Sequence, residues 1–441
     1  MMNILIAVHG FPPTHSAGAE RRAERMARWL AANGHRVTVF AVERLDEPGF
    51  RVEALEQDGF TVHRLYYDVK EGDFYRNLYD YPRAGQAFAA LLAANSFDLV
   101  HVISGYLLGG QVIHTARKAG LPVIITLTEY WFMCARLNLI QPNGGLCSGP
   151  ESDEKCMRCL MEDKRRYRLP AQASPLLMDA FWSIAQRLPF ANGMTEMVSE
   201  RRTTLRDALN AANLVICPSQ YLISKFAEFG FDTTRYIFMR QGLNTPTGEK
   251  PARTTTEAGR TRLGYVGQIK PHKGVDLLVD AAINLLQTGH DISLEIWGTE
   301  SEAPEYVTLL KERTAAYPTI RWKGRYLGSA VWTVLSNLDV LVVPSRWYEN
   351  SPNAILEAYE MRLPVVATNL GGMSELVEHE KTGLVFTLND AADLLAQLKR
   401  LITEPDLLER LRAAIPSVKT IDQEMRELVE AYHQLAATQQ P

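Results

Sequence analysis

The chain has 441 residues and a mass of 49.5 kDa, which is enough for two or three domains that each bury their own core. Hydrophobic residues make up 46% and charged residues 22%, and these average values exclude a disordered or fibrous chain. With 47 basic and 51 acidic side chains the formal net charge is −4, so nucleic acid is not an expected partner.

The N-terminal segment predicts the start of a doubly wound α/β domain. Residues 3–8 form a short apolar run, typical of a parallel strand that is buried on both faces. A loop ending at Gly18 follows, then an amphipathic helix over 19–33 and a strand over 37–42. Gly18 would let a ligand approach the backbone closely. The order strand, loop, helix, strand opens a doubly wound domain.

Further strands are predicted at 97–103, 123–127 and 214–217. The segment 134–210 between them has helical patches but no alternation with strands, and we interpret it as an insertion. No uncharged apolar run reaches the roughly 18 residues that span a bilayer. The first residues also lack the features of a secretory signal, so we expect a cytoplasmic location.

Four of the five cysteines lie in this insertion, at Cys134, Cys147, Cys156 and Cys159. Structural disulfides are rare in a reducing cytoplasm. Four thiolates in a loop-rich segment, two of them in a C-x2-C pair, indicate a structural zinc site. Four free or partly buried thiols and an iron–sulfur cluster are the alternatives. Cys217 ends a predicted strand and is expected in the core.

A basic run at 164–168 precedes an aromatic-rich helix predicted over 175–190. Such a segment can dock on a membrane surface, here the inner face, where a lipid-linked acceptor would reside. The alternative interpretation is that the apolar stripe belongs to the core or to the wall of an acceptor groove.

The polar, proline-bearing stretch 242–259 has the composition of a linker. We therefore place an N-terminal domain at 1–245 and a second domain at 246–418. The remaining residues, 419–441, predict a terminal helix that packs on either domain, the N-terminal one included.

The second domain repeats the pattern of the first. A strand at 262–266 leads into a loop with Gln268 and Lys273, then a helix over 275–287 and a strand over 292–297. Ligands bind at the carboxyl ends of parallel strands, so two such domains predict a site in an inter-domain cleft.

The densest candidate site follows a strand at 338–343. Ser351 before Pro352 predicts a helix start with the serine as N-cap, and its free amides form an anion site. Glu349 lies just outside this helix and Glu357 inside it, on the order of 8 Å along the axis. Two carboxylates beside an anion site suit a ligand with hydroxyls and phosphates. The alternative is that they complement the helix dipole and face solvent.

Several motifs together identify a family. They are Ser16 to Glu20, Val266 to Ile269 with Lys273-Gly274, the Glu349-x7-Glu357 pair, Pro364 to Thr368 with Gly371-Gly372, and Thr382 to Phe386. With these motifs the chain resembles the family-4 retaining glycosyltransferases of the GT-B fold over nearly its full length. Tyr130 to Cys134 is similar to an element of a cysteine-bearing subset of that family.

The resemblance implies two Rossmann-like, doubly wound parallel-sheet domains that face an inter-domain cleft. It implies retaining transfer from a nucleoside-diphosphate sugar, bound by the second domain, to a glycan, lipid-linked or small hydroxyl acceptor on the first, without a catalytic metal. Glu349 would hold hydroxyls of the donor sugar, and Glu357 those of the ribose. Lys273 and the backbone around Asn350, Ser351, Pro352 and Asn353 would hold the diphosphate. Glu349 and Lys273 are the implied catalytic residues, and Gly18 adds a donor contact.

Two positions depart from the usual family pattern. Gln268 stands where an arginine usually contacts the diphosphate, so phosphate binding would depend more on Lys273. Thr128 and Glu129 stand where many relatives have His-Asp, and Glu129 would then orient the acceptor.

Two other functions stay open from the sequence. One is a catalytically silent scaffold that binds nucleotide sugars, and the other is a nucleotide-sugar epimerase or phosphorylase on the same fold. A dehydrogenase is disfavoured, because neither first turn has a G-x-G-x-x-G motif.

Overall fold

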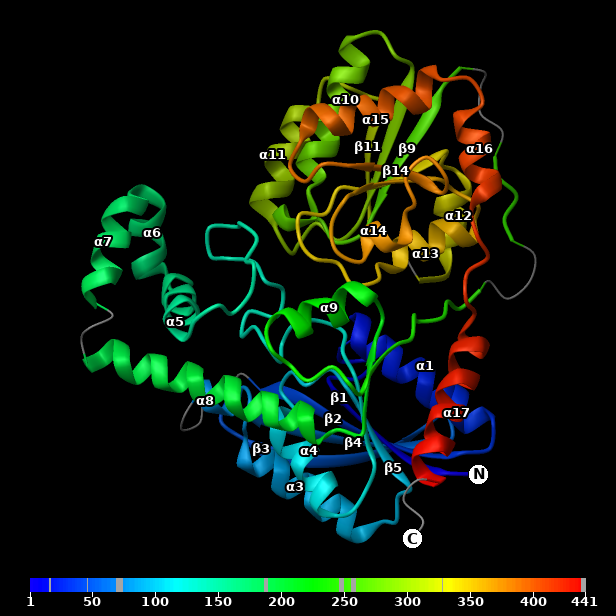
Figure 1. Cartoon of the computed structure of the whole chain (residues 1–441). Helices are drawn as coiled ribbons and strands as arrows, with labels where there is room; N and C mark the ends of the chain where they lie inside the picture. The colour runs from blue at the N-terminus through cyan, green and yellow to red at the C-terminus, as the bar shows by residue number, and fades with distance from the viewer. Residues whose placement is uncertain are drawn as a thin grey trace. The chain divides into compact units, whose positions relative to one another are not determined.

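The computed structural model describes residues 1–15, 17–45, 47–68, 74–185, 189–245, 250–254, 259–326 and 328–437. The chain forms two compact units (Figure 1). Unit 1 comprises Met1–Met239 and Asp422–Pro441, and unit 2 comprises Arg240–Ile421. The division at 239/240 lies a few residues before the expected boundary at 245/246. Residues 246–249, which follow that boundary, lie outside the described part.

Unit 1 is built on an eight-stranded sheet in the order β3-β4-β2-β1-β5-β6-β7-β8. Its strands are β1 (Asn3–His9), β2 (Arg36–Leu45), β3 (Phe50–Gln57), β4 (Phe60–Asp68), β5 (Leu99–Ile103), β6 (Val123–Thr126), β7 (Leu214–Cys217) and β8 (Tyr236–Phe238). Every pairing is parallel except that of β3 with β4. Ile4 to Val8 of β1 are fully buried, as expected for a central parallel strand. The edge hairpin β3–β4 is an element that the sequence analysis does not predict.

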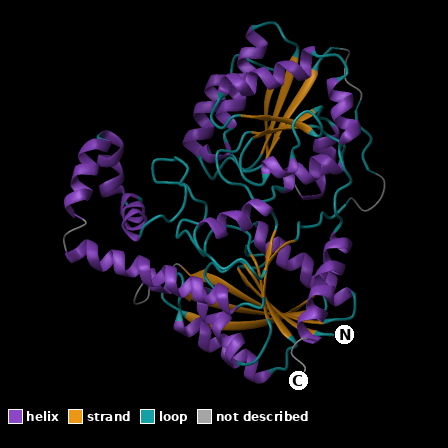
Figure 2. Cartoon of the chain, in the orientation of Figure 1, coloured by secondary structure: helices purple, strands orange, loops and turns teal. Residues whose placement is uncertain are grey.

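Helices flank this sheet (Figure 2). They are α1 (Gly18–Ala32), α2 (Phe74–Asn77), α3 (Pro82–Ala94), α4 (Gly109–Lys118), α9 (Gln220–Glu228) and α17 (Ile421–Ala437). Glu424 of α17 accepts a hydrogen bond of 2.5 Å from Arg22 of α1, and both side chains are buried. The hydroxyl of Tyr432 lies 2.6 Å from Nδ1 of His101 in β5. These contacts attach the last helix of the chain to unit 1.

The segment between β6 and β7 is helical. It contains α5 (Asp153–Glu162), α6 (Arg165–Ala173), α7 (Pro175–Ala185) and α8 (Pro189–Ala211). The helix predicted over 175–190 is therefore α7 followed by the start of α8, and residues 186–188 lie outside the described part. A small core of its own unites α5, α7 and α8 around Met157, Met161, Trp182 and Val198.

Unit 2 contains a six-stranded parallel sheet in the order β11-β10-β9-β12-β13-β14. Its strands are β9 (Thr261–Val266), β10 (Ile292–Trp297), β11 (Ile320–Gly324), β12 (Val340–Val343), β13 (Val365–Thr368) and β14 (Gly383–Phe386). Val340 and Val342 belong to one core cluster, and Leu341 and Val343 belong to another. Because alternate residues of β12 enter separate clusters, this strand is buried on both faces.

The elements between these strands are α10 (Val275–Gln287), α11 (Pro304–Thr314), α12 (Val331–Ser336), α13 (Asn353–Glu360), α14 (Met373–Leu376), α15 (Ala391–Thr403) and α16 (Leu407–Ala414), with short 3-10 turns η1 (Pro271–Lys273) and η2 (Gly328–Ala330). Each unit is thus a parallel-sheet α/β domain with flanking helices, which confirms the predicted fold class. The direction of strand addition reverses between β1 and β5 in unit 1 and between β9 and β12 in unit 2. Ligands of such sheets bind at the carboxyl ends of the strands at these reversal points.

Candidate functional site

The loops that follow β9 and β12 meet at the reversal point of unit 2. β9 and β12 are neighbouring parallel strands, so their carboxyl ends lie side by side. The loop after β9 contains η1, and the carbonyl of His272 there accepts a hydrogen bond of 2.8 Å from the Arg346 amide in the loop after β12. The site predicted from the sequence is therefore assembled from two segments that are about seventy residues apart in the chain.

Lys273 and Glu349 form an ion pair across these two loops. The Nζ atom of Lys273 lies 2.5 Å from Oε1 of Glu349, which also accepts a hydrogen bond of 3.2 Å from Ser345. The Lys273 ammonium lies 4.8 Å from the centre of the Trp347 ring, in cation–π range. Glu349 is only 9% exposed. The structure thus brings together the two residues for which the resemblance implies a catalytic role.

Two close approaches of the backbone fix these loops. Gly274 has φ +70°, and a Cβ atom there would lie 1.9 Å from the carbonyl oxygen of Pro344. The Gly372 amide donates to the Glu349 carbonyl at 2.7 Å, and a Cβ atom on Gly372 would lie 1.7 Å from the carbonyl oxygen of Asn350. Only glycine fits at either place, because any side chain would overlap with main-chain atoms.

The helix after this loop begins later than predicted. Pro352 is the N-cap of α13, and no side chain caps the helix. The prediction that Ser351 is the capping residue is therefore wrong. Its hydroxyl is buried and has no hydrogen-bond partner among the described residues. Instead, the side-chain amide of Gln241 donates to the Ser351 carbonyl at 2.6 Å and to Oδ1 of Asn353 at 3.2 Å. These two hydrogen bonds hold the chain just before the helix.

The remaining predicted donor residues occupy different environments. Glu357 is half-buried in α13, four residues after Asn353 and so about 6 Å along the axis, which is shorter than expected because the helix starts later. Asn350 is buried. The Gln268 side chain is exposed and donates to Glu302 at 3.4 Å, while the backbone carbonyl of Gln268 accepts from the Tyr265 hydroxyl at 2.5 Å.

Charged and aromatic residues that the sequence analysis does not single out surround the Lys273–Glu349 ion pair. Arg346 forms a two-pronged ion pair with Asp276, with both nitrogen–oxygen distances at 2.7 Å. Burial acts to raise the pKa of Asp276, but hydrogen bonds from Arg346 and Tyr306 outweigh it and lower that pKa. Burial, followed by the charge of Lys273, lowers the pKa of His272 to about 4, so this imidazole is neutral at pH 7. Lys273 therefore supplies positive charge here without competition from a charged His272.

Unit 1 has a corresponding loop at its own reversal point, between β1 and α1. The carboxylate of Glu43 in β2 accepts from the Phe11 amide at 3.2 Å and from Thr14 at 3.0 Å, while Arg64 donates to the Phe11 carbonyl at 2.8 Å. A Cβ atom on Gly18, the first residue of α1, would meet no atom within 4 Å. The backbone at the start of α1 is therefore open to a ligand.

Glu129, on the predicted acceptor side, is already engaged within unit 1. Its Oε1 accepts from the Ser104 hydroxyl at 2.5 Å and its Oε2 from the Trp131 amide at 3.0 Å. Burial raises the pKa of this carboxyl group. Both Glu129 and Thr128 are half-buried. The structure gives Glu129 a role in holding the loop after β6, and its role toward an acceptor stays a prediction.

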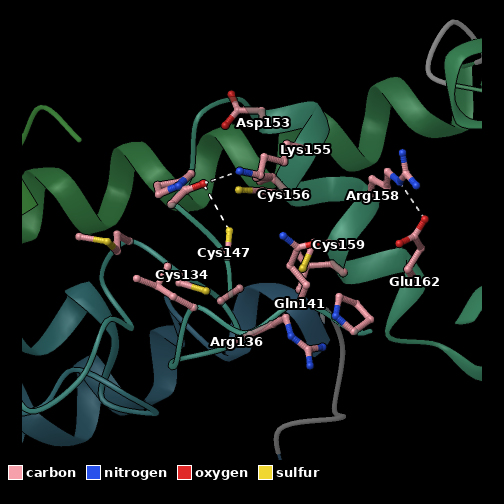
Figure 3. Close-up of a pocket in the computed structure, with 18 of the residues that line it drawn as sticks. Cys134, Arg136, Gln141, Cys147, Asp153, Lys155, Cys156, Arg158, Cys159 and Glu162 are labelled. Carbon is pink, nitrogen blue, oxygen red and sulfur yellow. Dashed lines mark hydrogen bonds and ion pairs between the residues drawn. The ribbon is translucent and has the colours of Figure 1, made fainter. Parts of the chain in front are cut away.

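The four cysteines of the insertion line one cavity of about 290 Å³ (Figure 3). Burial, opposed by the charge of Arg136 and aided by the thiols of Cys134, Cys147 and Cys156, raises the pKa of Cys159 to about 12. Within the described ranges, however, no group of three or more His, Cys, Asp or Glu side chains is placed where it could hold a metal ion. The thiols as placed do not fit a metal ion, and the zinc site stays a prediction.

Comparisons with known proteins match both units. The family model described as "Glycosyl transferase 4-like domain" matches residues 17–242, and that described as "Glycosyl transferases group 1" matches residues 260–404. The lipopolysaccharide core biosynthesis mannosyltransferase LpsB of Rhizobium meliloti is 33% identical over 187 residues, which are 39% of this chain and 51% of that protein. The chain spans about half the length of the curated relatives it matches.

Solved structures share the fold over almost the whole chain. Sucrose-phosphate synthase of Thermosynechococcus elongatus has a TM-score of 0.66 at 18% identity and covers 98% of this chain and 99% of its own. HepE of Anabaena, solved in complex with UDP and glucose, has a TM-score of 0.61 at 16% identity and covers 98% of this chain and 100% of its own.

Proposed function

Because the chain belongs to the family-4 glycosyltransferases of the GT-B fold, we propose that it transfers a sugar from a nucleoside-diphosphate sugar to a hydroxyl acceptor, with retention at the anomeric carbon. The observation that carries this proposal is the Lys273–Glu349 ion pair at the reversal point of unit 2. It places one cation and one carboxylate next to the start of α13, where a ligand with both phosphates and hydroxyls would be recognised.

In this proposal the sugar nucleotide binds both members of the ion pair, its diphosphate at Lys273 and its sugar at Glu349. The ammonium has three N–H donors, of which the 2.5 Å contact with Glu349 uses one. A diphosphate between Lys273 and the backbone amides of Asn353 and Ala354, which begin α13, would gain charge-assisted hydrogen bonds from both. Glu349 would then accept hydrogen bonds from hydroxyls of the donor sugar, and Glu357 from those of the ribose.

The same arrangement supports departure of the diphosphate. Negative charge develops on the leaving phosphate oxygen in the transition state, so donors that are already fixed around it lower the barrier. The loops after β9 and β12 are held by Gly274 and Gly372, which limits reorganisation at that moment. For retention, the leaving oxygen would accept the acceptor's proton on the face from which it departs, so no protein nucleophile is needed.

HepE, which shares the fold, was solved with UDP and glucose, and this supports a nucleoside diphosphate as the ligand of unit 2. LpsB is described as a lipopolysaccharide core mannosyltransferase, which supports a glycan or lipid-linked acceptor. We assign the acceptor to unit 1, where Thr128 and Glu129 lie, and Gly18 of the same unit would add a contact to the donor.

A transfer assay with Glu349→Gln tests the proposal. Mass spectrometry of the wild-type chain with a panel of nucleotide sugars and glycan or lipid-linked acceptors first identifies the donor. The substitution removes the charge that would hold the donor sugar, and we expect kcat/KM to fall by about 100-fold or more. Glu378→Gln is the matched control, since Glu378 is exposed and pairs with Lys381. Unchanged transfer by Glu349→Gln would refute the assignment.

The same experiment separates the alternatives. Binding of a nucleotide sugar without any transfer or turnover would identify a silent scaffold. Conversion of the donor without a glycosylated acceptor would identify an epimerase or a hydrolytic reaction. Release of a sugar phosphate would identify a phosphorylase.

A further inference from the structure

The hairpin of α6 and α7 exposes more large apolar side chains than any other segment of the described chain. Leu169, Leu176, Leu177, Phe181 and Ile184 are 50%, 82%, 71%, 41% and 68% exposed, respectively. Figure 1 shows these two helices side by side. We call these five side chains the apolar patch. Soluble chains rarely expose such a cluster unless it binds a partner or a membrane.

The apolar patch is an outer face of the α6–α7 hairpin, with Leu169 on α6 and the other four residues on α7, and it is not a loosely packed part of the core. Met178, Trp182 and Ala185 on the inner face are buried, and the Trp182 indole donates to Glu162 of α5 at 2.8 Å. At about 100° per residue, the exposed apolar residues of α7 cover an arc of about 140° that is separate from this inner face. The core of the insertion is therefore complete without the apolar patch.

A basic rim adjoins the apolar patch. Lys164, Arg165 and Arg166 are exposed where α6 begins. Arg166 lies 4.8 Å from the centre of the Tyr167 ring, and this ring lies 6.4 Å from that of Phe181 in α7. The acidic residues near the rim are paired with other arginines: Asp179 of α7 with Arg158 at 2.6 Å, Glu162 with Arg158 at 2.8 Å, and Asp163 with Arg136.

We propose that the α6–α7 hairpin docks the protein on an anionic lipid bilayer. Leu176, Leu177 and Ile184 would enter the boundary between headgroups and acyl chains, while Lys164, Arg165 and Arg166 contact anionic headgroups. The Tyr167 ring lies between Arg166 of the rim and Phe181 of the apolar patch, and aromatic rings of this kind favour a membrane interface. With 11 residues, or about 16 Å, α7 would lie in the plane of the surface. None of the described helices could span a bilayer.

Charge decides between this occupant and a second copy of the chain. In a symmetric dimer the same patch meets itself, which would bring two basic rims together. An anionic surface offers the opposite charge, and we therefore commit to the membrane. This inference goes beyond the proposed transfer reaction, and its test measures binding alone.

Vesicle flotation of the full chain tests it, with vesicles of phosphatidylcholine alone and with 30% phosphatidylglycerol. We expect binding to the anionic vesicles, weakened by salt because the rim contributes charge. The triple variant Leu176→Gln, Leu177→Gln, Ile184→Gln and the variant Arg165→Gln, Arg166→Gln should each reduce binding at least tenfold. Val52→Gln, Leu55→Gln is the control, since both are exposed apolar residues outside the patch, on the edge strand β3.

Circular dichroism confirms that each variant is folded. Absence of binding to anionic vesicles, or equal binding by the triple variant, would overturn the proposal. So would a dimer of the wild-type chain that the triple variant abolishes, because a second copy would then cover the apolar patch.

Discussion

The positions of Lys273 and Glu349 depend on backbone contacts that only glycine permits. Gly274 follows Lys273 directly and packs against Pro344, which begins the loop that carries Glu349. Gly372 packs against Asn350 and donates to the Glu349 carbonyl. The ion pair at the carboxyl ends of the strands is therefore positioned in part by Gly274 and Gly372, which have no side chains.

Gly274→Ala should destabilise unit 2. A positive φ costs an alanine about 1–2 kcal/mol, and the overlap of its Cβ with the Pro344 carbonyl adds about 1–3 kcal/mol. Gly34→Ala is the matched control, because Gly34 has φ +83° but no atom within 4 Å of its Cβ position. Urea unfolding measures both. Equal losses in the two variants would show that the close approach to Pro344 contributes nothing.

At the level of single residues, the sequence predicts which side chains form the candidate site but not the contacts that hold them in place. Lys273 and Glu349 are indicated by a spacing and a motif, and the structure pairs them. The role of Arg346 could not be predicted, because its partner Asp276 lies seventy residues away and only the fold brings them together. The sequence predicts that Ser351 caps α13, but the side-chain amide of Gln241, just before the linker, holds the preceding chain instead.

At the scale of elements, apolar runs and glycine-containing loops were sufficient to predict the buried parallel strands. The central residues of β1 and all residues of β12 are buried on both faces, so these sequences are continuous and apolar. The edge strand β3 is not predicted, because most of its residues are exposed and its sequence lacks a regular alternation of apolar and polar residues. The attachment of α17 depends on tertiary contacts that no local pattern shows.

The ion pair between Arg22 and Glu424 should contribute strongly to the attachment of α17. Glu424 is fully buried, so Glu424→Gln would leave the Arg22 charge without its partner and cost about 3–5 kcal/mol of unfolding free energy. The double variant Arg22→Met, Glu424→Leu should recover most of this loss, because no buried charge remains. Chemical denaturation compares the two. A single variant as stable as the wild type would contradict the role of this pair.

The cysteine cavity yields a separate prediction about metal. All four thiols face one cavity, and a zinc site would require its lining segments to close further. If zinc is bound, elemental analysis of the purified chain should find one ion per molecule, and Cys156→Ser should lose it. Protein without metal, in which four thiols of the insertion titrate as free groups, would refute zinc. An iron–sulfur cluster would instead appear as iron and visible absorbance.

At the scale of the whole molecule, buried histidines predict acid sensitivity. Burial lowers the pKa of His101 to about 3 and that of His9 to about 4. An unfolded histidine has a pKa near 6.5, so below that pH the unfolded state binds protons that the folded state does not. Stability from these groups is complete above pH 6.5 and is lost as pH falls toward these values.

Each such histidine should contribute a slope of up to about 1.4 kcal/mol per pH unit between pH 6.5 and its folded pKa. His101→Gln should flatten the dependence of unfolding free energy on pH in this range. His114→Gln, at an exposed position of α4, is the matched control. A pH profile that His101→Gln does not alter would show that His101 does not titrate as its burial requires.

The account depends most on a nucleoside diphosphate bound by Lys273 in unit 2. Calorimetry with UDP, GDP and ADP on the full chain measures this directly. Lys273→Ala should weaken the preferred nucleotide by about 10- to 100-fold, which corresponds to a lost charged hydrogen bond of about 1.5–3 kcal/mol. Lys381→Ala, at an exposed surface lysine, should bind as the wild type does. Full affinity in Lys273→Ala, or no affinity of the wild-type chain for any of the three, would contradict the account.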